Sequence, residues 1–265
     1  MSTGFHALHH ADRPLLLPNA WDFASAAALA AAGFDAIGTT SLGVAAANGL
    51  PDAAGLARDE TVALAKRLVR LPCPVTVDIE AGFSADPQQV ADLVSELADI
   101  GVAGINMEDG RGARLADPTT QVALIHAVKR RAPEIFLNAR ADTYWLGVDA
   151  TVPATLDRAR RYLDAGADGI FVPGLVREED IAAVTAALPV PVNVLHQPAL
   201  GLNRLADLGV RRVSTGSLLF RAALHATVAT ALAVREGAPL PAGIPGYAEV
   251  DALSRQIDSS NRLRS

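Results

Sequence analysis

The 265-residue sequence predicts a single α/β domain folded as a (β/α)8 TIM-type barrel with an extra C-terminal helical segment. The first observation is that eight short apolar runs are each followed by a helical pattern, which is typical of a parallel sheet covered by helices. The second is that residues 32–37, 100–105, 165–170 and 208–213 repeat one device, a glycine helix cap followed by a turn and the next strand. A chain of this length that is half hydrophobic commonly forms one such domain.

The predicted strands are apolar and rich in β-branched residues, and they cover residues 15–20, 35–40, 75–80, 104–109, 135–140, 169–174, 192–197 and 212–216. The predicted helices between and after them cover residues 22–32, 59–70, 86–100, a segment from 117 onward, 153–165, 177–188, 200–208 and 217–235. Asp86-Pro87 and Asp117-Pro118 pair a capping side chain with a proline at the first helical position. An open doubly wound sheet would more often carry a glycine-rich loop after its first strand, and residues 19–22 form no such loop.

Two stretches are predicted to be irregular, the small-residue loop 41–49 and the loop that contains Tyr144 and Trp145. The C-terminal segment 236–265 reads as a Pro/Gly-rich linker followed by one more helix over 247–261. Because eight units already close a barrel, this helix must pack on its outside or on a neighbouring subunit. A peripheral chain end is an equally good interpretation of the pattern.

Composition excludes several classes of function. The 23 Lys+Arg against 29 Asp+Glu, without a basic cluster, argue against a nucleic acid partner. The single cysteine, Cys73, excludes an intramolecular disulfide and a multi-cysteine metal site. We see no membrane-spanning segment and no secretory signal, so we expect no membrane partner and a cytoplasmic location.

Polar residues gather where the predicted strands end, which is where barrel enzymes carry their sites. Asp78 and Glu80 end the third strand two residues apart, so we expect them to point to one side, with Glu108 from the fourth strand and Asp52 from the loop after the second. An isolated pair of this kind is more often two solvated charges. Several acids around one space fit a hard, oxygen-liganded cation, Mg2+ or Mn2+.

The same strand ends supply groups for an organic acid. Arg140, after the fifth strand, can bind a substrate carboxylate with two nitrogens. The amides of Ser41, Leu42 and Gly43 can bind an anion, as small-residue turns do. His196 is a candidate acid or base near neutral pH, although a structural histidine is equally consistent with the sequence.

Four motifs in order resemble the isocitrate lyase/phosphoenolpyruvate mutase superfamily over residues 15–232, namely GTTSLGVAAANGLPD (38–52), VDIEAGF (77–83), GINMEDG (104–110) and NARADTYWLG (138–147). The resemblance implies a (β/α)8 barrel, Mg2+, enolate chemistry on 2-oxo or 2-hydroxy acids, and a homo-oligomer, a dimer or a tetramer whose subunits exchange the last barrel helix.

Carried over by position, the resemblance assigns roles to individual residues. Asp78 resembles the direct metal ligand, Glu80 stands where a second aspartate is usual, and Glu108 resembles a further acid of the metal site, with Asp52 near the metal. Ser41 and Gly43 resemble the carboxylate-binding segment, Arg140 the substrate arginine and Asn193 a polar residue of the seventh strand.

The chain also departs from this pattern. The isocitrate and methylisocitrate lyases carry a Lys-Arg/Lys-Cys-Gly-His loop after the fourth strand, and here residues 111–115 are short and lack cysteine. Arg111 and Arg114 of this segment either hold a distal anionic group or are ordinary surface charges.

The sequence therefore predicts a Mg2+-dependent lyase or decarboxylase that cleaves a C–C bond of a small 2-oxo or 2-hydroxy carboxylate through a metal-stabilised enolate. Two alternatives stay open. One is P–C bond chemistry of the phosphonomutase or phosphonopyruvate hydrolase type, and the other is a non-catalytic protein that binds 2-oxo acids.

Overall fold

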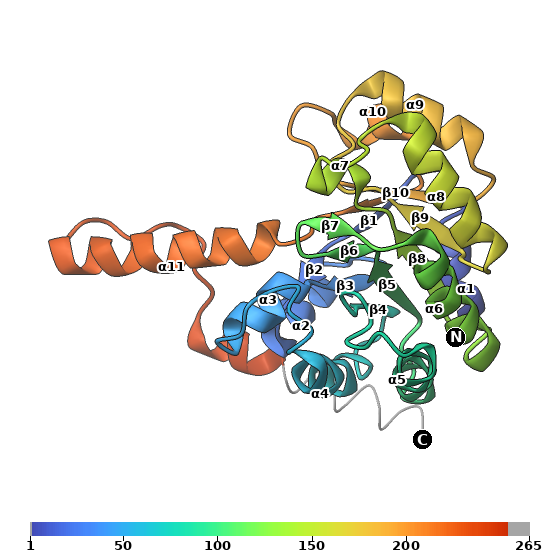
Figure 1. Ribbon diagram of the computed structural model, residues 1–265. Helices are drawn as coiled ribbons and strands as arrows, with labels where there is room; N and C mark the ends of the chain where they lie inside the picture. Colours follow the sequence, from blue (N-terminus) through green and yellow to red (C-terminus); the bar gives the residue numbers. More distant parts are fainter. Residues whose placement is uncertain (1, 254–265) are drawn as a thin grey trace.

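The computed structural model describes residues 2–253 and is a closed, parallel β-barrel surrounded by helices (Figure 1). The strands of the main sheet follow the order β1-β11-β10-β9-β8-β5-β4-β3-β2. The sheet closes because β1 (Leu15–Leu17) pairs with β11 and β2 (Asn19–Ala20) pairs with β3. These two strands are the halves of one predicted strand, divided at Pro18, which has no N–H to donate. The prediction of a (β/α)8 barrel is confirmed.

The remaining barrel strands lie within or at the predicted ranges: β3 Ile37–Thr39, β4 Val75–Asp78, β5 Gly104–Glu108, β8 Phe136–Arg140, β9 Gly169–Phe171, β10 Val192–Leu195 and β11 Arg212–Ser214. The helices that follow them are α2 Phe23–Ala31, α3 Ser41–Ala47, α4 Arg58–Leu68, α5 Pro87–Asp99, α6 Pro118–Arg131, α7 Thr143–Leu146, α8 Val152–Asp164, α9 Glu178–Ala187, α10 Leu202–Asp207 and α11 Leu218–Glu236.

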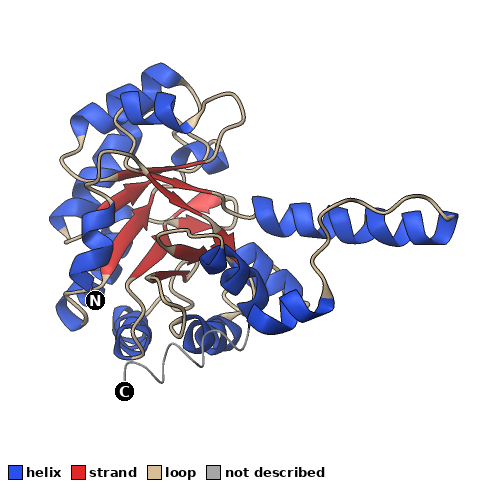
Figure 2. Ribbon diagram, turned by 180° about the vertical axis from the view of Figure 1, so that it is seen from behind, coloured by secondary structure: helices blue, strands red, loops and turns tan. Residues whose placement is uncertain are grey.

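Most of the helices between strands wrap the outside of the barrel, as Figure 2 shows, and α5 illustrates how the sequence produces this arrangement. The side chain of Asp86 caps the helix by accepting a hydrogen bond from the backbone N–H of Gln88 at 2.9 Å. The buried residues Val90, Val94 and Leu97 recur at helical spacing, so one face of α5 packs against the sheet.

Three segments differ from the sequence-based expectation. The expected loop 41–49 begins with the short helix α3, and the loop with Tyr144 and Trp145 contains the short helix α7. Residues 110–115 form a small hairpin of β6 (Gly110–Arg111) and β7 (Arg114–Leu115). Alanine-rich and aromatic sequence is compatible with short helical turns, and the small-residue composition of 41–49 did not distinguish a helix from a loop.

A helix that the sequence pattern does not predict, α1 (Ser2–Leu8), covers the N-terminal end of the barrel. Phe5 is fully buried and contacts the ring of Phe136 edge-on, with ring centroids 5.6 Å apart. His9 stacks on the same ring at 4.2 Å, and burial lowers the pKa of His9 to about 3. This end of the barrel is therefore sealed by aromatic packing, and the open end lies at the carboxyl ends of the strands.

The last described elements leave the barrel. Helix α11 projects away from it as an arm (Figure 1), and Phe220 is its one buried residue among those described. By length and composition α11 is apolar enough to cross a membrane, with a mean hydropathy of 1.3, a test that the core helix of a soluble protein also passes. Of the helix predicted over 247–261, residues 247–253 are helical and the rest lies outside the described residues.

Candidate active site

A cavity of about 150 Å³ opens at the carboxyl ends of the barrel strands. Six of the predicted site residues line it, namely Ser41, Leu42, Asp52, Asp78, Glu108 and Arg140. They come from four different strand ends and from the segments that follow, which agrees with the position of sites in barrel enzymes. The other four predicted residues, Gly43, Glu80, Asn193 and His196, do not line it.

Asp78 is the last residue of β4 and faces the cavity. Its backbone N–H donates to Thr39 Oγ1 at 2.9 Å, and its Oδ1 accepts from the backbone N–H of Glu80 at 3.0 Å. Burial raises the pKa of Asp78, the charge of Arg140 opposes this rise, and the charge of Asp52 adds to it. The carboxylate is thus held in place beside another acid, in a position where a cation would stabilise its charge.

Glu80, which we expect beside Asp78, does not line the cavity, although the charges of Asp52 and Asp78 act on it. Strand β4 ends at Asp78, and Glu80 adopts a left-handed backbone with φ 49°, so the alternation of side chains along a strand no longer applies. Glu80 is buried, and its Oε2 accepts from the backbone N–H of Gly55 at 2.9 Å, while its Oε1 has no hydrogen-bond partner among the described residues. Burial also raises the pKa of Glu80. It holds the loop that carries Asp52.

Arg140, at the end of β8, is the cation of the cavity. Its Nη1 lies 2.8 Å from Glu108 Oε2, and its Nε donates to Asp142 Oδ1 at 2.6 Å. Among the described residues Nη2 has no hydrogen-bond partner, so this nitrogen is available to a substrate carboxylate. Burial raises the pKa of Glu108 to about 8, although the charge of Arg140 opposes the rise.

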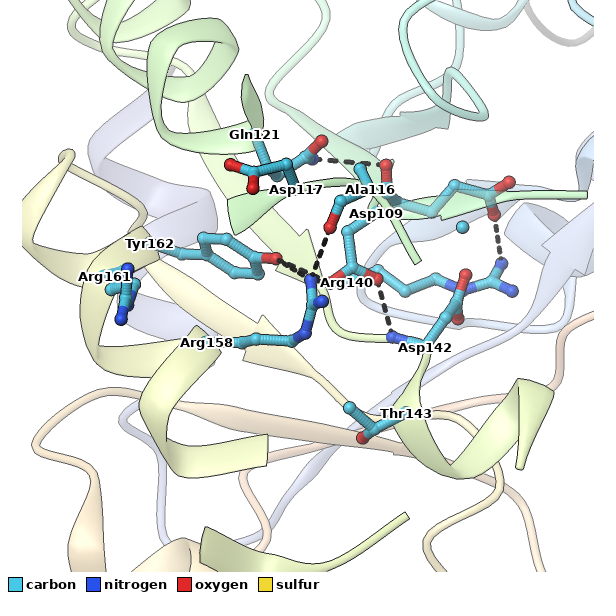
Figure 3. Close-up of polar contacts among 12 residues, drawn as sticks. Asp109, Ala116, Asp117, Gln121, Arg140, Asp142, Thr143, Arg158, Arg161 and Tyr162 are labelled. Carbon is cyan, nitrogen blue, oxygen red and sulfur yellow. Dashed lines mark hydrogen bonds and ion pairs between the residues drawn. The ribbon is translucent and has the colours of Figure 1, made fainter. Parts of the chain in front are cut away.

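A second set of hydrogen bonds, which runs through Asp142 and Asp109, also positions the guanidinium of Arg140 (Figure 3). The backbone N–H of Asp142 donates to Asp109 Oδ1 at 2.8 Å. The other oxygen of the fully buried Asp109 accepts from Tyr162 Oη at 2.6 Å and from Arg158 Nη1 at 3.0 Å. Helix α8 therefore fixes Asp109, which fixes Asp142, which orients Arg140.

The segment Ser41–Gly43 forms the first turn of α3, where backbone N–H groups have no partner within the helix. A hydrogen bond from the backbone of Ser41 lowers the pKa of Asp78 and thus opposes the effect of burial. Gly43 does not line the cavity, and a Cβ there would lie 2.8 Å from side-chain atoms of Thr40 and Trp21. The glycine is needed for close packing.

The predicted residues of the seventh strand do not reach the cavity. Asn193 is buried inside the barrel, where its Oδ1 accepts from Ser214 Oγ at 3.1 Å, and His196 is exposed. Leu195 lines the cavity instead. Residues 193 and 195 point to the same side of β10. Residue 195 is nearer to the carboxyl end of the strand, where the cavity opens, and so it lines the cavity while residue 193 does not.

The two arginines of the 111–115 segment lie outside the cavity. Arg111 Nη1 donates to the backbone oxygens of Glu108 and Gly110, at 3.0 and 2.7 Å, and its Nη2 donates to Gln121 at 3.1 Å. Arg114 is exposed. Arg111 thus supports the hairpin beside Glu108. Its nitrogens are used for this support and are not directed at a distal anionic group of a substrate.

Sequence reasoning missed Asp142, Trp145 and the apolar lining residues that follow β8. Asp142 lies inside the NARADTYWLG motif, so its signal was present, two residues after Arg140. Asn19 also lines the cavity, and its Oδ1 accepts from the backbone N–H of Gly216 at 2.9 Å, which ties the first strand to the last.

The donor set of the cavity fits Mg2+. Among the described residues that line it, four carboxylates, Asp52, Asp78, Glu108 and Asp142, accompany one cation, Arg140, and the acidic ligands all offer oxygen atoms. Within residues 2–253 no three His, Cys, Asp or Glu side chains already converge on one metal position. A Mg2+ site does not require three converging side chains, since Mg2+ is commonly held by one or two carboxylates and keeps several waters.

Comparison with known proteins identifies the family. The family profile of phosphoenolpyruvate phosphomutase matches residues 5–235. The chain belongs to this family. It is 48% identical to protein Rv1998c of Mycobacterium tuberculosis (strain ATCC 25618 / H37Rv). The aligned region of 258 residues covers 97% of this chain and 98% of that protein.

Two further matches carry functional names. The 2-methylisocitrate lyase of Bacillus subtilis (strain 168) is 31% identical over 198 residues, 71% of this chain and 64% of that protein. A phosphonopyruvate hydrolase solved with oxalate and Mg++ shares the fold with a TM-score of 0.84 at 22% identity, over 99% of this chain and 96% of that chain. The resemblance stated from the sequence is confirmed, and so is the prediction of an enzyme of this lyase group.

Proposed function

We propose that this chain is a Mg2+-dependent lyase or decarboxylase that cleaves a C–C bond of a small 2-oxo or 2-hydroxy carboxylate through an enolate. The observation that carries the proposal is the cavity that joins Asp78 to the Glu108–Arg140 ion pair at the open end of the barrel. A relative named 2-methylisocitrate lyase supports C–C cleavage.

Different lining residues would bind the metal and the substrate carboxylate. Asp78 would hold Mg2+ directly, with Asp52 and Glu108 holding its waters, and the bound ion would supply Lewis-acid stabilisation of the enolate. Arg140 presents Nη2 to the substrate carboxylate, and Asp142 and Glu108 fix the plane of its guanidinium. The N–H groups at the start of α3 lie on the same rim and offer further donors to a carboxylate.

A substrate panel with Mg2+ tests the proposal. It contains oxaloacetate, 2,3-dimethylmalate, methylisocitrate, the alkyl-bearing 4-hydroxy-2-oxopentanoate, and phosphonopyruvate. We expect a 2-oxo acid to be released from at least one carbon substrate. Phosphate release from phosphonopyruvate alone would instead support the P–C alternative, which the family's phosphomutase description favours. Metal-dependent oxalate binding without turnover of any compound would support a binding protein.

We also propose a homo-oligomer in which α11 is exchanged between subunits. Leu224, Val228 and Leu232 form a stripe at spacings of four residues on α11, and they are 52%, 59% and 38% exposed. A second copy of the chain is the partner that this stripe suits. We further propose a cytoplasmic location, with neither nucleic acid nor a membrane as partner.

A further inference from the structure

The cavity has two chemically different sides. Its charged residues come from the segment between α3 and α4, from β4, β5 and β8, and from the residues just after β8, whereas α7, β9 with the residues after it, and β10 contribute five apolar residues that we call the apolar wall. These residues lie on α7, at the end of β9 and just after it, and on β10, and they are Trp145, Leu146, Phe171, Pro173 and Leu195. The rings of Trp145 and Phe171 each lie 5.7 Å from the guanidinium carbon of Arg140, so the wall begins directly beside the carboxylate-binding cation.

A second substrate carboxylate would have no cation to receive it. Among the residues that line the cavity, within the described part of the chain, Arg140 is the one cation, and two of its nitrogens are already bonded to Glu108 and Asp142. Two other arginines lie near the cavity without lining it. Arg111 is committed to backbone oxygens and Gln121, and the fully buried Arg212 donates to Asn106 at 3.1 Å and to Ser214 at 3.4 Å. The lining already carries four carboxylates, so another anion would add to an excess of negative charge.

The apolar wall would also remove water from a second substrate carboxylate without offering it a hydrogen-bond donor or a positive charge. An unpaired carboxylate against apolar side chains is strongly unfavourable, whereas an alkyl or aryl group gains by leaving water. In the sheet, β8 with Arg140 stands between β4, which ends at Asp78, and the strands β9 and β10, which contribute to the wall. The tail of a bound acid therefore extends toward the wall when the head is held as proposed above.

We infer that the preferred substrates are 4-hydroxy-2-oxo monocarboxylates whose far end is alkyl or aryl. When their C3–C4 bond breaks, the 4-hydroxyl gives up its proton, an aldehyde carries the apolar tail away, and the electron pair of the bond stays on the 2-oxo acid as its enolate. Acids with a second or third carboxylate at that end, such as methylisocitrate, are disfavoured. This inference rests on the proposed function, because Mg2+, Asp78 and Arg140 must fix the head of the molecule.

A matched pair of stable probes tests the tail independently of the head. 2-Oxoglutarate and 5-methyl-2-oxohexanoate have the same number of heavy atoms and differ in a terminal carboxylate against an isopropyl group. Their dissociation constants are measured by calorimetry with Mg2+ on the full-length protein, with oxalate as the probe for the head. We expect 5-methyl-2-oxohexanoate to bind roughly tenfold or more tightly than 2-oxoglutarate, from the burial of its methyl groups.

Two variants place a cation in the wall, Leu195→Lys and, should that chain fail to fold, Leu146→Lys. We expect either to lower the preference for the alkyl probe by about tenfold, since the new ammonium pairs with the second carboxylate. Leu202→Lys is the matched control, because Leu202 is exposed on α10 and does not line the cavity.

The three ways in which these experiments can fail are distinguishable. Equal or tighter binding of 2-oxoglutarate by the unmodified protein, with oxalate bound normally, would overturn the inference and leave the proposed function standing. An unchanged preference in a folded Leu195→Lys or Leu146→Lys protein would equally overturn it. Absence of oxalate binding with Mg2+ would overturn the proposed function, and this inference with it.

Discussion

Replacing Arg140 by lysine keeps the positive charge but removes the forked arrangement of nitrogen atoms with which the guanidinium binds several acceptors at once. The guanidinium reaches Asp142 at 2.6 Å and Glu108 at 2.8 Å from two different nitrogens, and its Nη2 remains for the substrate. A lysine ammonium is a single point of charge on a flexible stem and cannot reproduce this fork. We therefore expect Arg140→Lys to leave the substrate carboxylate without a correctly oriented donor.

The magnitude follows from the hydrogen bonds that the substitution removes. A hydrogen bond to a charged group contributes about 1.5–3 kcal/mol, and each 1.4 kcal/mol is a factor of about ten in affinity. Loss of the Nη2 donor should therefore weaken the binding of oxalate about 10–100-fold. One of the two buried carboxylates also loses its partner, so the thermal midpoint should fall by several degrees, at about 2–4 °C for each kcal/mol.

The assay is calorimetric titration of oxalate into the protein with saturating Mg2+. The matched control is Arg161→Lys, because Arg161 is half-exposed on α8, pairs with Asp157 at 3.1 Å and does not line the cavity. The control should bind oxalate as the unmodified protein does. Unchanged oxalate affinity in Arg140→Lys would refute the assignment of this arginine.

Three further predictions concern the supporting network, the arm and the buried acids. Tyr162→Phe removes the 2.6 Å hydrogen bond to the buried Asp109 and should lower the free energy of unfolding by about 1.5–3 kcal/mol in denaturant titrations, and no loss would contradict the network. Leu224→Glu on the apolar stripe of α11 should reduce the oligomer mass in light scattering, whereas Val234→Glu, on another face of the helix, should not; identical masses would argue against helix exchange. Because the pKa of Glu108 is raised from 4.5 to about 8 on folding, the metal-free folded protein holds a proton that the unfolded chain releases, so stability should fall as the pH rises from about 4.5 to about 8. Glu108→Gln should make this fall shallower, and an equally steep fall would show that another group is responsible.

Much of the fold and half of the site followed from simple patterns. Apolar runs ending in Asp78, Glu108 and Arg140 mark strand ends, and parallel strands in a barrel bring such ends together. The repeated glycine caps indicated the spacing of the units. These features are local in sequence, so they could be read without knowledge of tertiary contacts.

The residues that were misplaced depend on features that are not local. Glu80 lies in a left-handed turn, so the two-residue period that linked it to Asp78 had already ended. Whether Asn193 or Leu195 reaches the cavity depends on the stagger of the strands around the barrel. Helix α1 was missed because, among residues 4–8, Phe5 alone is fully buried, which is too weak a periodic signal.

Exchange of the methyl protons of pyruvate with solvent shows whether the protein stabilises a metal-bound enolate, whichever bond it cleaves. The protein is incubated with pyruvate in D2O, with and without Mg2+, and the methyl signal is followed by NMR. We predict exchange that requires Mg2+ and is abolished in Asp78→Ala, while the circular dichroism spectrum of that variant stays unchanged. Failure of Mg2+ to accelerate exchange, or full exchange in a folded Asp78→Ala protein, would contradict the proposed function.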